Sequence, residues 1–367
     1  MKRVLHVIGR LDRGGAETLI TEIYKNIDRE KVQFDFLVYG GHGVFDREVN
    51  KFGGQIFYAK KRFNKNPFAY MRELYRFFKA HNEYEIVHCH LTGMAGYILK
   101  MAKKAGVKIA IGHSHTAGFE EMNIGVLRKI VRRHAFTLLN KYADFIFACS
   151  MKAMTYCRIK ASYNAKIVRN AIDVEKFEFN SSDRDDIRRK LNISDNETVY
   201  CHIGRFDNQK NHEYLIDRFY EVHIKNPSTK LILVGKGDLQ QAVLDKVREL
   251  NLLGSVIFTG VIENTYAYLS ASDMFVFPSR CEGLGIVLIE AQANGLKCIA
   301  SDRVPIEADA TGNVKFLPLE DEKLWVEEML DSQRDFSIVN DVREKVKQSG
   351  YDIHEVANEL TEFYLSR

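Results

Sequence analysis

Short apolar, β-rich runs alternate with longer helical stretches along the chain, and they do so in two series. The first series comprises Val4–Ile8, Phe34–Tyr39, Ile86–His90, Lys108–Gly112 and Phe145–Ser150. The second series comprises Thr198–Ile203, Lys230–Val234, Val256–Thr259, Met274–Phe277 and Lys297–Ala300. This alternation is typical of βαβ units, whose strands form a parallel sheet. The sequence therefore predicts two doubly wound α/β domains.

The length of the chain agrees with two domains. It has 367 residues, and single hydrophobic cores stop growing at about 250–300 residues. Val174–Asn196 is polar and separates the two series, so we expect an interdomain connection there and place the boundary between residues 175 and 176. Glu355–Tyr364 predicts a helix at the end of the chain.

Composition indicates a globular cytoplasmic protein. No apolar run approaches the ~18–20 residues of a membrane span, and Met1–Ile8 is too short and strand-like for a signal peptide. The six cysteines show no CxxC or other metal-binding spacing, so we expect reduced thiols in or near the core.

Charge is shared unevenly between the halves. Residues 1–175 hold 30 Lys and Arg against 16 Asp and Glu, whereas residues 176–367 hold 23 against 33. Either the two domains simply differ, or the basic half meets an anionic partner such as a membrane surface. Nucleic acid is a poor fit, because no base-reading helix or stacking module is evident.

One segment places two carboxylates around a glycine-rich turn: Pro278-Ser-Arg-Cys-Glu-Gly-Leu-Gly-Ile-Val-Leu-Ile-Glu290. Glu282 lies in the turn, and Glu290 lies in the helix that we expect to follow. Gly283 and Gly285 allow a ligand to approach the backbone closely, and a helix N-terminus favours phosphate. Two carboxylates beside an anion site predict a ligand with hydroxyl groups at each end and phosphates between, such as a nucleotide sugar.

This segment resembles the P-S-x-x-E-G-x-G-x-x-x-x-E signature of family 4 of the retaining glycosyltransferases. Five other motifs resemble that family in its order: Gly14-Gly15-Ala16-Glu17, His113-Ser-His115, Asn170-Ala-Ile-Asp173, Gly204-Arg205 with Lys210-Asn211, and Ile299-Ala-Ser-Asp302. The resemblance implies the GT-B fold, in which two Rossmann-like domains face across a cleft. It implies an acceptor-binding domain at 1–175, a donor-binding domain at 176–350, and a last helix, about 351–367, that crosses back to the first domain. The residues alone fit equally well an ordinary C-terminal helix of the second domain.

The resemblance also implies roles for individual residues. Arg205 and Lys210 would bind the donor diphosphate, Glu290 the ribose and Glu282 the transferred sugar. The donor-binding set is Gly15, Gly204, Arg205, Lys210, Glu282, Gly283, Leu284, Gly285 and Glu290. The acceptor-binding set is Gly14, Gly15 and His113, and the catalytic set is His115, Glu282, Arg205 and Lys210.

Four histidines end two predicted strands, in His88-Cys-His90 and His113-Ser-His115. The i, i+2 spacing puts each pair on one face of its strand, but no cysteine or carboxylate completes a metal site, so neither a metal nor a cofactor is expected. Family resemblance makes His115 the residue that hydrogen-bonds the transferred sugar or supports the reaction, and His113 a second candidate. His88 and His90 would line or support the pocket, and Asn170 and Asp173 would shape the cleft loop.

Other chemistries fit less well. A glycoside hydrolase needs both carboxylates at one bond, whereas here they would lie at opposite ends of the ligand. No G-x-G-x-x-G follows the first strand, which disfavours an NAD-linked enzyme. A metal-dependent GT-A enzyme needs an Asp-x-Asp at a strand end, and Asp183-Arg-Asp185 lies in the polar connection.

Val126–Tyr142 predicts a helix with two alternative interpretations. Arg128, Lys129, Arg132 and Arg133 lie beside apolar residues, as in helices that bind anionic bilayers. Lys60–Lys65 and Lys103-Lys104 would extend this basic surface. Alternatively, the apolar face packs on the sheet and the charges are merely solvated.

The sequence thus predicts a cytoplasmic glycosyltransferase, with a possible peripheral membrane contact. It would move a hexose or N-acetylhexosamine from a nucleotide-diphosphate sugar, most simply a UDP-sugar, to a lipid-linked or growing surface glycan. The alternatives are a nucleotide-sugar epimerase on the same fold and a binding protein without transfer activity. The sequence departs from the family pattern at Gly295-Leu-Lys297 and at Arg303–Asp309. These departures leave open the identity of the transferred sugar and of the nucleotide base, more than the activity itself. They resemble a subgroup found in capsule and exopolysaccharide synthesis.

Overall fold

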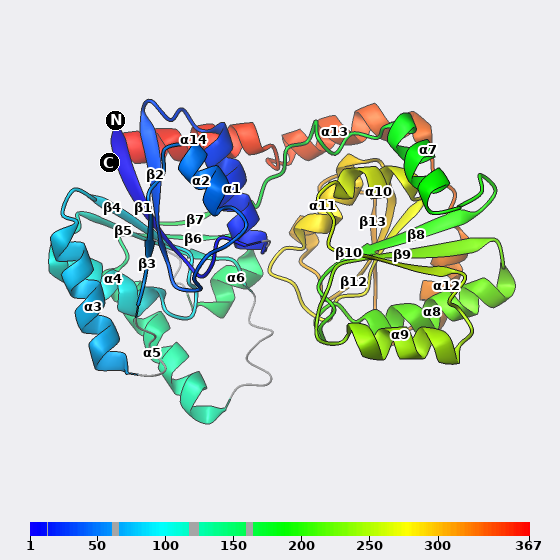
Figure 1. Ribbon diagram of the computed structural model, residues 1–367, viewed down its shortest axis with the longest axis horizontal. Helices are drawn as coiled ribbons and strands as arrows, with labels where there is room; N and C mark the ends of the chain where they lie inside the picture. The colour runs from blue at the N-terminus through cyan, green and yellow to red at the C-terminus, as the bar shows by residue number, and fades with distance from the viewer. Residues whose placement is uncertain (13, 61–65, 117–124, 159–163) are drawn as a thin grey trace. The chain divides into compact units, whose positions relative to one another are not determined.

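The computed structural model describes residues 1–12, 14–60, 66–116, 125–158 and 164–367. The chain forms two compact units, each built on its own sheet (Figure 1). The N-terminal unit comprises Met1–Ile172 and Asp352–Arg367, and the C-terminal unit comprises Asp173–Tyr351. The end of the chain therefore belongs to the first unit.

The N-terminal unit has a seven-stranded parallel sheet in the order β3-β2-β1-β4-β5-β6-β7. Its strands are β1 (Lys2–Ile8), β2 (Val32–Val38), β3 (Ile56–Tyr58), β4 (Ile86–Cys89), β5 (Ile109–Ser114), β6 (Phe145–Ala148) and β7 (Ala165–Ile167). Its helices are α1 (Gly15–Asn26), α2 (Asp46–Lys51), α3 (Pro67–Ala80), α4 (Ala95–Ala105), α5 (Val126–Tyr142), α6 (Met151–Tyr156) and α14 (Ile353–Leu365).

Apolar helix faces cover both sides of this sheet. Helices α1 and α14 pack on one face, and α3, α4 and α5 pack on the other (Figure 1). The Asp352 side chain caps α14 by accepting from the His354 N–H at 2.7 Å. The buried face of α14 carries Val356, Leu360 and Tyr364 against β1 and β2. The last helix is thus an integral layer of the N-terminal unit.

The C-terminal unit has a six-stranded parallel sheet in the order β10-β9-β8-β11-β12-β13. Its strands are β8 (Thr198–Ile203), β9 (Thr229–Val234), β10 (Val256–Gly260), β11 (Met274–Phe277), β12 (Lys297–Ser301) and β13 (Val314–Leu317). Its α-helices are α7 (Ser181–Lys190), α8 (His212–Lys225), α9 (Gln240–Glu249), α10 (Thr265–Ala271), α11 (Ile286–Ala293), α12 (Glu322–Leu330) and α13 (Val339–Gln348). Two short 3-10 helices are η2 (Ile306–Ala308) and η3 (Phe336–Ile338).

Helices α8, α9 and α12 enclose one core of this unit with the sheet. Trp325, on α12, is fully buried there and is the only tryptophan of the sequence. Helices α7, α10, α11 and α13 lie on the opposite side of the sheet (Figure 1). The fluorescence of Trp325 therefore reports the folding of the C-terminal unit.

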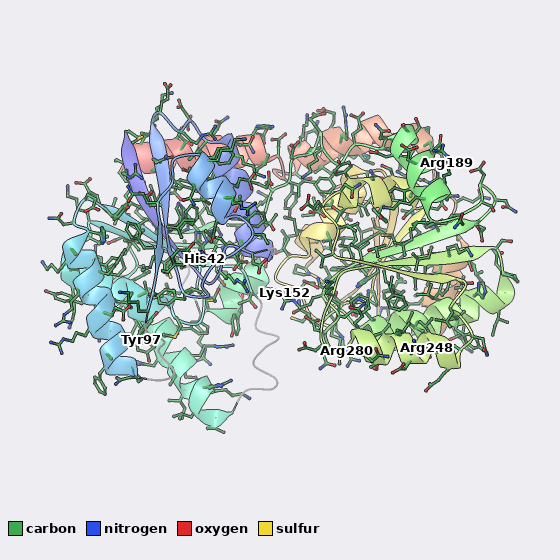
Figure 2. The ribbon with its side chains drawn as sticks, in the orientation of Figure 1. His42, Tyr97, Lys152, Arg189, Arg248 and Arg280 are labelled. Atoms are coloured by element: carbon green, nitrogen blue, oxygen red, sulfur yellow. The ribbon has the colours of Figure 1, made fainter. Side chains whose placement is uncertain are left out.

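The polar stretch expected as an interdomain connection contains a helix that was not predicted, because its middle forms α7. The Asn180 side chain caps this helix by accepting from the Asp183 N–H at 3.0 Å. On its inner face, Arg184 and Arg188 donate to Asp273 at 2.7 and 2.8 Å. Arg189 lies on the outer side, away from the sheet (Figure 2). Ion pairs with Asp273, rather than an apolar face, hold this helix against the unit. Its sequence therefore shows little apolar periodicity.

Strands β3, β7 and β13 were not predicted from the sequence. Each is three or four residues long and lies at or next to an edge of its sheet, where one-sided pairing weakens the apolar pattern. Among the described residues, no helix combines the length and the hydropathy needed to cross a bilayer.

Replacing Asp273 with asparagine should destabilise the C-terminal unit. Two buried or half-buried guanidinium groups would lose their counter-charge, at a cost of about 3 kcal/mol. The measurement is urea unfolding followed by Trp325 fluorescence. Asp186→Asn removes an exposed ion pair with Arg189 and should cost less than about 0.5 kcal/mol. Equal effects of the two substitutions would contradict this account of how α7 docks.

Candidate active site

In the C-terminal unit, the predicted donor residues follow two neighbouring strands. Strand β8 pairs with β11 on one side and with β9 on the other, so the strand order reverses beside it. The loop 204–211 follows β8, and the turn 278–285 follows β11. Ligands of open α/β sheets bind at this kind of switch point, at the carboxyl ends of the strands. The fold therefore brings together two motifs that lie about 70 residues apart in the sequence.

Lys210 and Glu282 form the central ion pair of this site. Lys210 Nζ donates to Glu282 Oε1 at 2.6 Å, and Gln209 Nε2 donates to Glu282 Oε2 at 3.2 Å. The side chain of Glu282 is 7% exposed, and that of Lys210 is 16% exposed. The ammonium group also lies 4.6 Å from the ring centroid of Phe277, at the end of β11. A carboxylate this deeply buried is stable because it is paired.

Asn211 and Arg280 hold the two loops against each other. Asn211 Nδ2 donates to the Pro278 carbonyl at 3.1 Å, and its Oδ1 accepts from Arg280 Nε and Nη2 at 3.1 and 2.9 Å. The backbone N–H of Arg280 donates to the Gln209 carbonyl at 2.8 Å. Sequence reasoning gave neither side chain a role. Asn211 could have been identified from its place beside Lys210 in the motif, whereas nothing in the sequence pointed to Arg280. Figure 2 labels Arg280 in the C-terminal unit.

Gly204 permits a close approach of the lysine stem. A Cβ at this position would lie 2.9 Å from Lys210 Cγ, closer than ordinary carbon contacts. Arg205, the next residue, is exposed at the start of the loop. The loop thus presents one half-buried cation that is paired to Glu282 and one exposed cation beside it.

Gly285 starts helix α11 in the left-handed conformation, with φ of 91°. The helix begins at the next residue, and Glu290 lies in its second turn, half-buried. Leu284 is buried and anchors the turn. On the inner face, Gln292 accepts from the backbone N–H groups of Ala310 and Thr311 at 2.9 and 3.2 Å. The segment beyond β12 therefore holds α11 in place.

In the N-terminal unit, the predicted residues follow β1, β4 and β5, which are adjacent in the sheet. Gly14 is the N-cap of α1, and Gly15 is its first residue. His113 is the penultimate residue of β5, and His115 lies just beyond it. Because β1 is where this sheet reverses its strand order, both motifs lie at a second switch point.

The histidines form a compact cluster that also includes His6, which sequence reasoning missed because a lone histidine in an apolar strand gives no signal. The ring centroids of His88 and His90 are 4.4 Å apart, and those of His113 and His115 are 4.0 Å apart. The Tyr364 hydroxyl, from α14, pairs with His88 Nδ1 at 2.6 Å. Burial lowers the pKa of His6 to about 3 and that of His115 to about 4, so these rings are neutral near pH 7.

Among the residues that the structure describes, two groups of three histidines have ring nitrogens within 4.8 Å of one another. They are His6, His88, His90 and His90, His113, His115. His90 belongs to both groups, and its two ring nitrogens pair with His6 and His115 at 3.0 and 2.9 Å. A metal ion in either group would have to break one of these hydrogen bonds. The arrangement therefore favours a hydrogen-bonded cluster of neutral imidazoles.

Comparison with known proteins gives the family. The sequence profile "Glycosyltransferase Family 4" matches residues 13–176, and the profile "Glycosyl transferases group 1" matches residues 183–329. A protein of Bacillus subtilis (strain 168) that carries the name glycosyltransferase EpsF is 31% identical over 99% of this chain and 96% of its own length. The chain belongs to glycosyltransferase family 4.

Two further relatives of this family 4 glycosyltransferase have informative names. The capsular polysaccharide biosynthesis glycosyltransferase CapH of Staphylococcus aureus is 26% identical over 100% of this chain and 99% of its own. An Escherichia coli UDP-Gal:α-D-GlcNAc-diphosphoundecaprenol α-1,3-galactosyltransferase is 29% identical over 62% of this chain and 60% of its own length. The family makes this protein a glycosyltransferase, and the name of the Staphylococcus aureus relative assigns that relative to capsular polysaccharide biosynthesis.

Solved structures agree on the fold. HepE of Anabaena, in complex with UDP and glucose, superimposes with a TM-score of 0.82 over 99% of both chains, at 18% identity. The family 4 glycosyltransferase described here therefore has the GT-B fold, with two doubly wound units.

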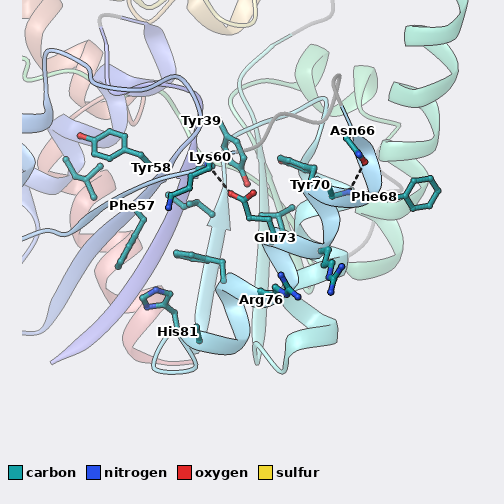
Figure 3. A pocket seen from close by; sticks show the side chains of 18 residues that line it. Tyr39, Phe57, Tyr58, Lys60, Asn66, Phe68, Tyr70, Glu73, Arg76 and His81 are labelled. Atoms are coloured by element: carbon teal, nitrogen blue, oxygen red, sulfur yellow. Dashed lines mark hydrogen bonds between the residues drawn. The ribbon is translucent and has the colours of Figure 1, made fainter.

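A separate pocket of about 870 Å³ lies along α3 in the N-terminal unit of this glycosyltransferase (Figure 3). Phe57 and Tyr58 of β3 and Tyr70 and Phe77 of α3 contribute apolar walls. None of the predicted site residues lines it. Residues 61–65, which join two of its lining residues, lie outside the part of the chain that the structure describes.

Replacing Gly285 with alanine should strain the turn that starts α11. The new Cβ would sit 3.0 Å from Phe277 Cε1 at a φ of 91°, and left-handed backbone costs an L-residue about 1–2 kcal/mol. Urea unfolding followed by Trp325 fluorescence measures the loss. Gly254→Ala places its Cβ in open space and should change stability by less than about 0.5 kcal/mol. An unchanged midpoint for Gly285→Ala would refute the strain.

Proposed function

We propose that the protein is a retaining, metal-independent glycosyltransferase that uses a UDP-sugar. It transfers a hexose or N-acetylhexosamine to a lipid-linked or growing surface polysaccharide. The observation that carries this proposal is the Lys210–Glu282 pair beside Arg205 at the switch point of the C-terminal unit. The name of the HepE structure includes UDP and glucose, which supports a UDP-sugar as the donor.

The donor diphosphate would bind to Arg205, Lys210 and the N-terminus of α11. Two cations and the positive end of a helix dipole stabilise the negative charge that grows on the leaving diphosphate. Lys210 donates to Glu282 at 2.6 Å, so a diphosphate that attracts Lys210 would release a carboxylate oxygen. Glu282 could then accept from hydroxyl groups of the sugar while Glu290 accepts from the ribose. The backbone of Gly15, Gly283 and Leu284 would complete the donor site.

Transfer would retain the configuration at the anomeric carbon. The acceptor hydroxyl oxygen bonds to the anomeric carbon on the face from which the diphosphate leaves, and the hydroxyl proton passes to a phosphate oxygen of the leaving group. The leaving group thus serves as the base, so the step needs neither an enzyme nucleophile nor a metal. His115 would hydrogen-bond the transferred sugar, and Gly14 and His113 would face the acceptor.

A membrane contact would suit a lipid-linked acceptor of the kind in the name of the Escherichia coli relative. The first half of α5 exposes Val126, Leu127 and Ile130, at 75%, 75% and 60%, beside the cations Arg128 and Lys129. Only the second half of α5 packs into the unit, through Ala135, Phe136, Leu138 and Leu139. The alternative that the whole apolar face packs on the sheet therefore fails for the first half. Apolar residues among cations suit the surface of an anionic bilayer.

A panel of UDP-, GDP-, ADP- and dTDP-sugars tests the donor site by thermal stabilisation. At a concentration of 100 Kd, the matching donor should stabilise the protein by about 2.7 kcal/mol. Glu290→Ala should abolish the shift, because the ribose loses its acceptor. Glu249→Ala, on the exposed end of α9, is the matched control and should keep it.

The donor that binds is then incubated with lipid-linked acceptors. Transfer should persist in EDTA, and NMR of the product should show the anomeric configuration of the donor. Inversion, loss of transfer in EDTA, or conversion of the donor without any acceptor would each reject the proposed reaction.

Vesicle sedimentation at low salt tests the membrane contact. Wild type should bind anionic vesicles, and Ile130→Asp should weaken binding about tenfold, because it removes apolar contact and adds a negative charge. Ile224 of α8 is 61% exposed, as Ile130 is 60%. Ile224→Asp, in the other unit, should bind like wild type. Binding that survives Ile130→Asp would exclude α5 as the docking surface.

A further inference from the structure

Three consecutive residues of the loop after β8 contact the turn after β11. The side chains of Gln209 and Lys210 reach Glu282, and the side chain of Asn211 reaches the backbone of Pro278. Glu282 therefore receives two donors of different chemistry, a neutral amide and an ammonium group. The two donors come from adjacent residues, but they respond differently to an anion that binds nearby.

The backbone at Gln209 is held to the turn by contacts that do not involve the lysine side chain. The carbonyl of Gln209 accepts from the backbone N–H of Arg280 at 2.8 Å. Asn211 is 6% exposed, has the left-handed φ of 58°, and donates to a backbone carbonyl of the turn at 3.1 Å. Asparagine is among the few residues that adopt this backbone readily. Backbone contacts thus set the position from which the Gln209 side chain reaches Glu282.

Each carboxylate oxygen of Glu282 has one side-chain donor among the residues that the structure describes. Lys210 Nζ donates to Oε1 at 2.6 Å, and Gln209 Nε2 donates to Oε2 at 3.2 Å. An ionised carboxylate only accepts, so the atom of Gln209 that faces it is the amide nitrogen. The Glu282 side chain is 7% exposed, and a carboxylate this buried is costly when it loses its donors.

A bound diphosphate would compete for only one of these two donors. Lys210 carries a full positive charge at the end of a flexible four-carbon stem, so a nearby anion attracts it strongly and it can move. The Gln209 amide is neutral, and the backbone behind it is held by the turn. With a diphosphate bound, Oε1 of Glu282 would therefore lose the ammonium group, whereas Oε2 would keep the amide.

We propose that Gln209 is a positioning residue, which holds Glu282 in place for the transferred sugar when the donor diphosphate draws Lys210 away. This inference rests on the proposed function. Glu282 keeps Oε2 anchored and offers Oε1 to a sugar hydroxyl. Recognition of the sugar is coupled to the diphosphate, because Oε1 is free only when Lys210 has another partner. UDP, which has the diphosphate but no sugar, gains nothing from Gln209.

Calorimetry on the full chain tests this role by comparing UDP with the UDP-sugar that stabilises wild type most. Gln209→Met keeps the length of the side chain and removes its N–H donor. The Kd of UDP should stay within about twofold. The Kd of the UDP-sugar should rise about tenfold, because Glu282 loses its remaining donor, and kcat/KM should fall by a similar factor.

Two further variants serve as references. Gln348→Met makes the same replacement at the exposed end of α13 and should change neither Kd. Asn211→Gly allows the left-handed backbone but removes the side chain that joins the two loops. It should therefore weaken the binding of UDP and of the UDP-sugar to the same extent. This parallel loss is the result expected of a residue that only supports the loops.

The outcomes separate this inference from the proposed function. Equal losses for UDP and the UDP-sugar in Gln209→Met, or no loss for either, would overturn the positioning role and leave the proposed function intact. If Gln209→Met fails to fold, Gln209→Ala removes the same donor without a long side chain and decides by the same comparison. If wild type binds neither ligand, the proposed function fails, and the positioning role fails with it.

Discussion

The reversal of strand order beside one central strand of each sheet is the constraint on which the sites depend. Right-handed crossovers send the chain outward from β8 and from β11 in opposite directions, so the loops after these strands separate and leave their carboxyl ends open. The same geometry opens the ends of β1 and β4. Residues far apart in the sequence meet at these points because parallel strands all end at one edge of the sheet.

Burial then decides what the assembled side chains can do. Glu282 keeps its charge in a low-dielectric site because Lys210 and Gln209 donate to it. The histidines hydrogen-bond to one another and not to a charged group, and desolvation keeps their rings neutral. One unit therefore presents charges suited to a diphosphate, while the other presents neutral, hydrogen-bonded rings. In the proposed function, the charged groups would stabilise a leaving group and the neutral rings would orient a sugar.

Much of the fold followed from apolar patterning, and the failures have physical causes. Central strands such as β8 and β11 have both faces buried, so their apolar runs gave the bounds that the structure has. The edge strands are short and half-covered and gave no such signal. Helix α7 was not predicted because Arg184 and Arg188 dock it through Asp273, and charged residues give no apolar periodicity. Helix α5 has the predicted bounds, but only packing showed that half of it is exposed.

The sequence by itself determined the fold class, the family and the residue types of the proposed donor site, because local motifs such as Pro278–Glu290 combine turn, helix start and carboxylates within a few residues. Only the tertiary structure decided which groups touch. Lys210 reaches Glu282, Asn211 joins two loops, and His6 completes a chain with His90 and His115. These contacts bridge neighbouring strands of a sheet. Strand order and register are long-range properties, which depend on how every crossover packs and which no short stretch of sequence contains.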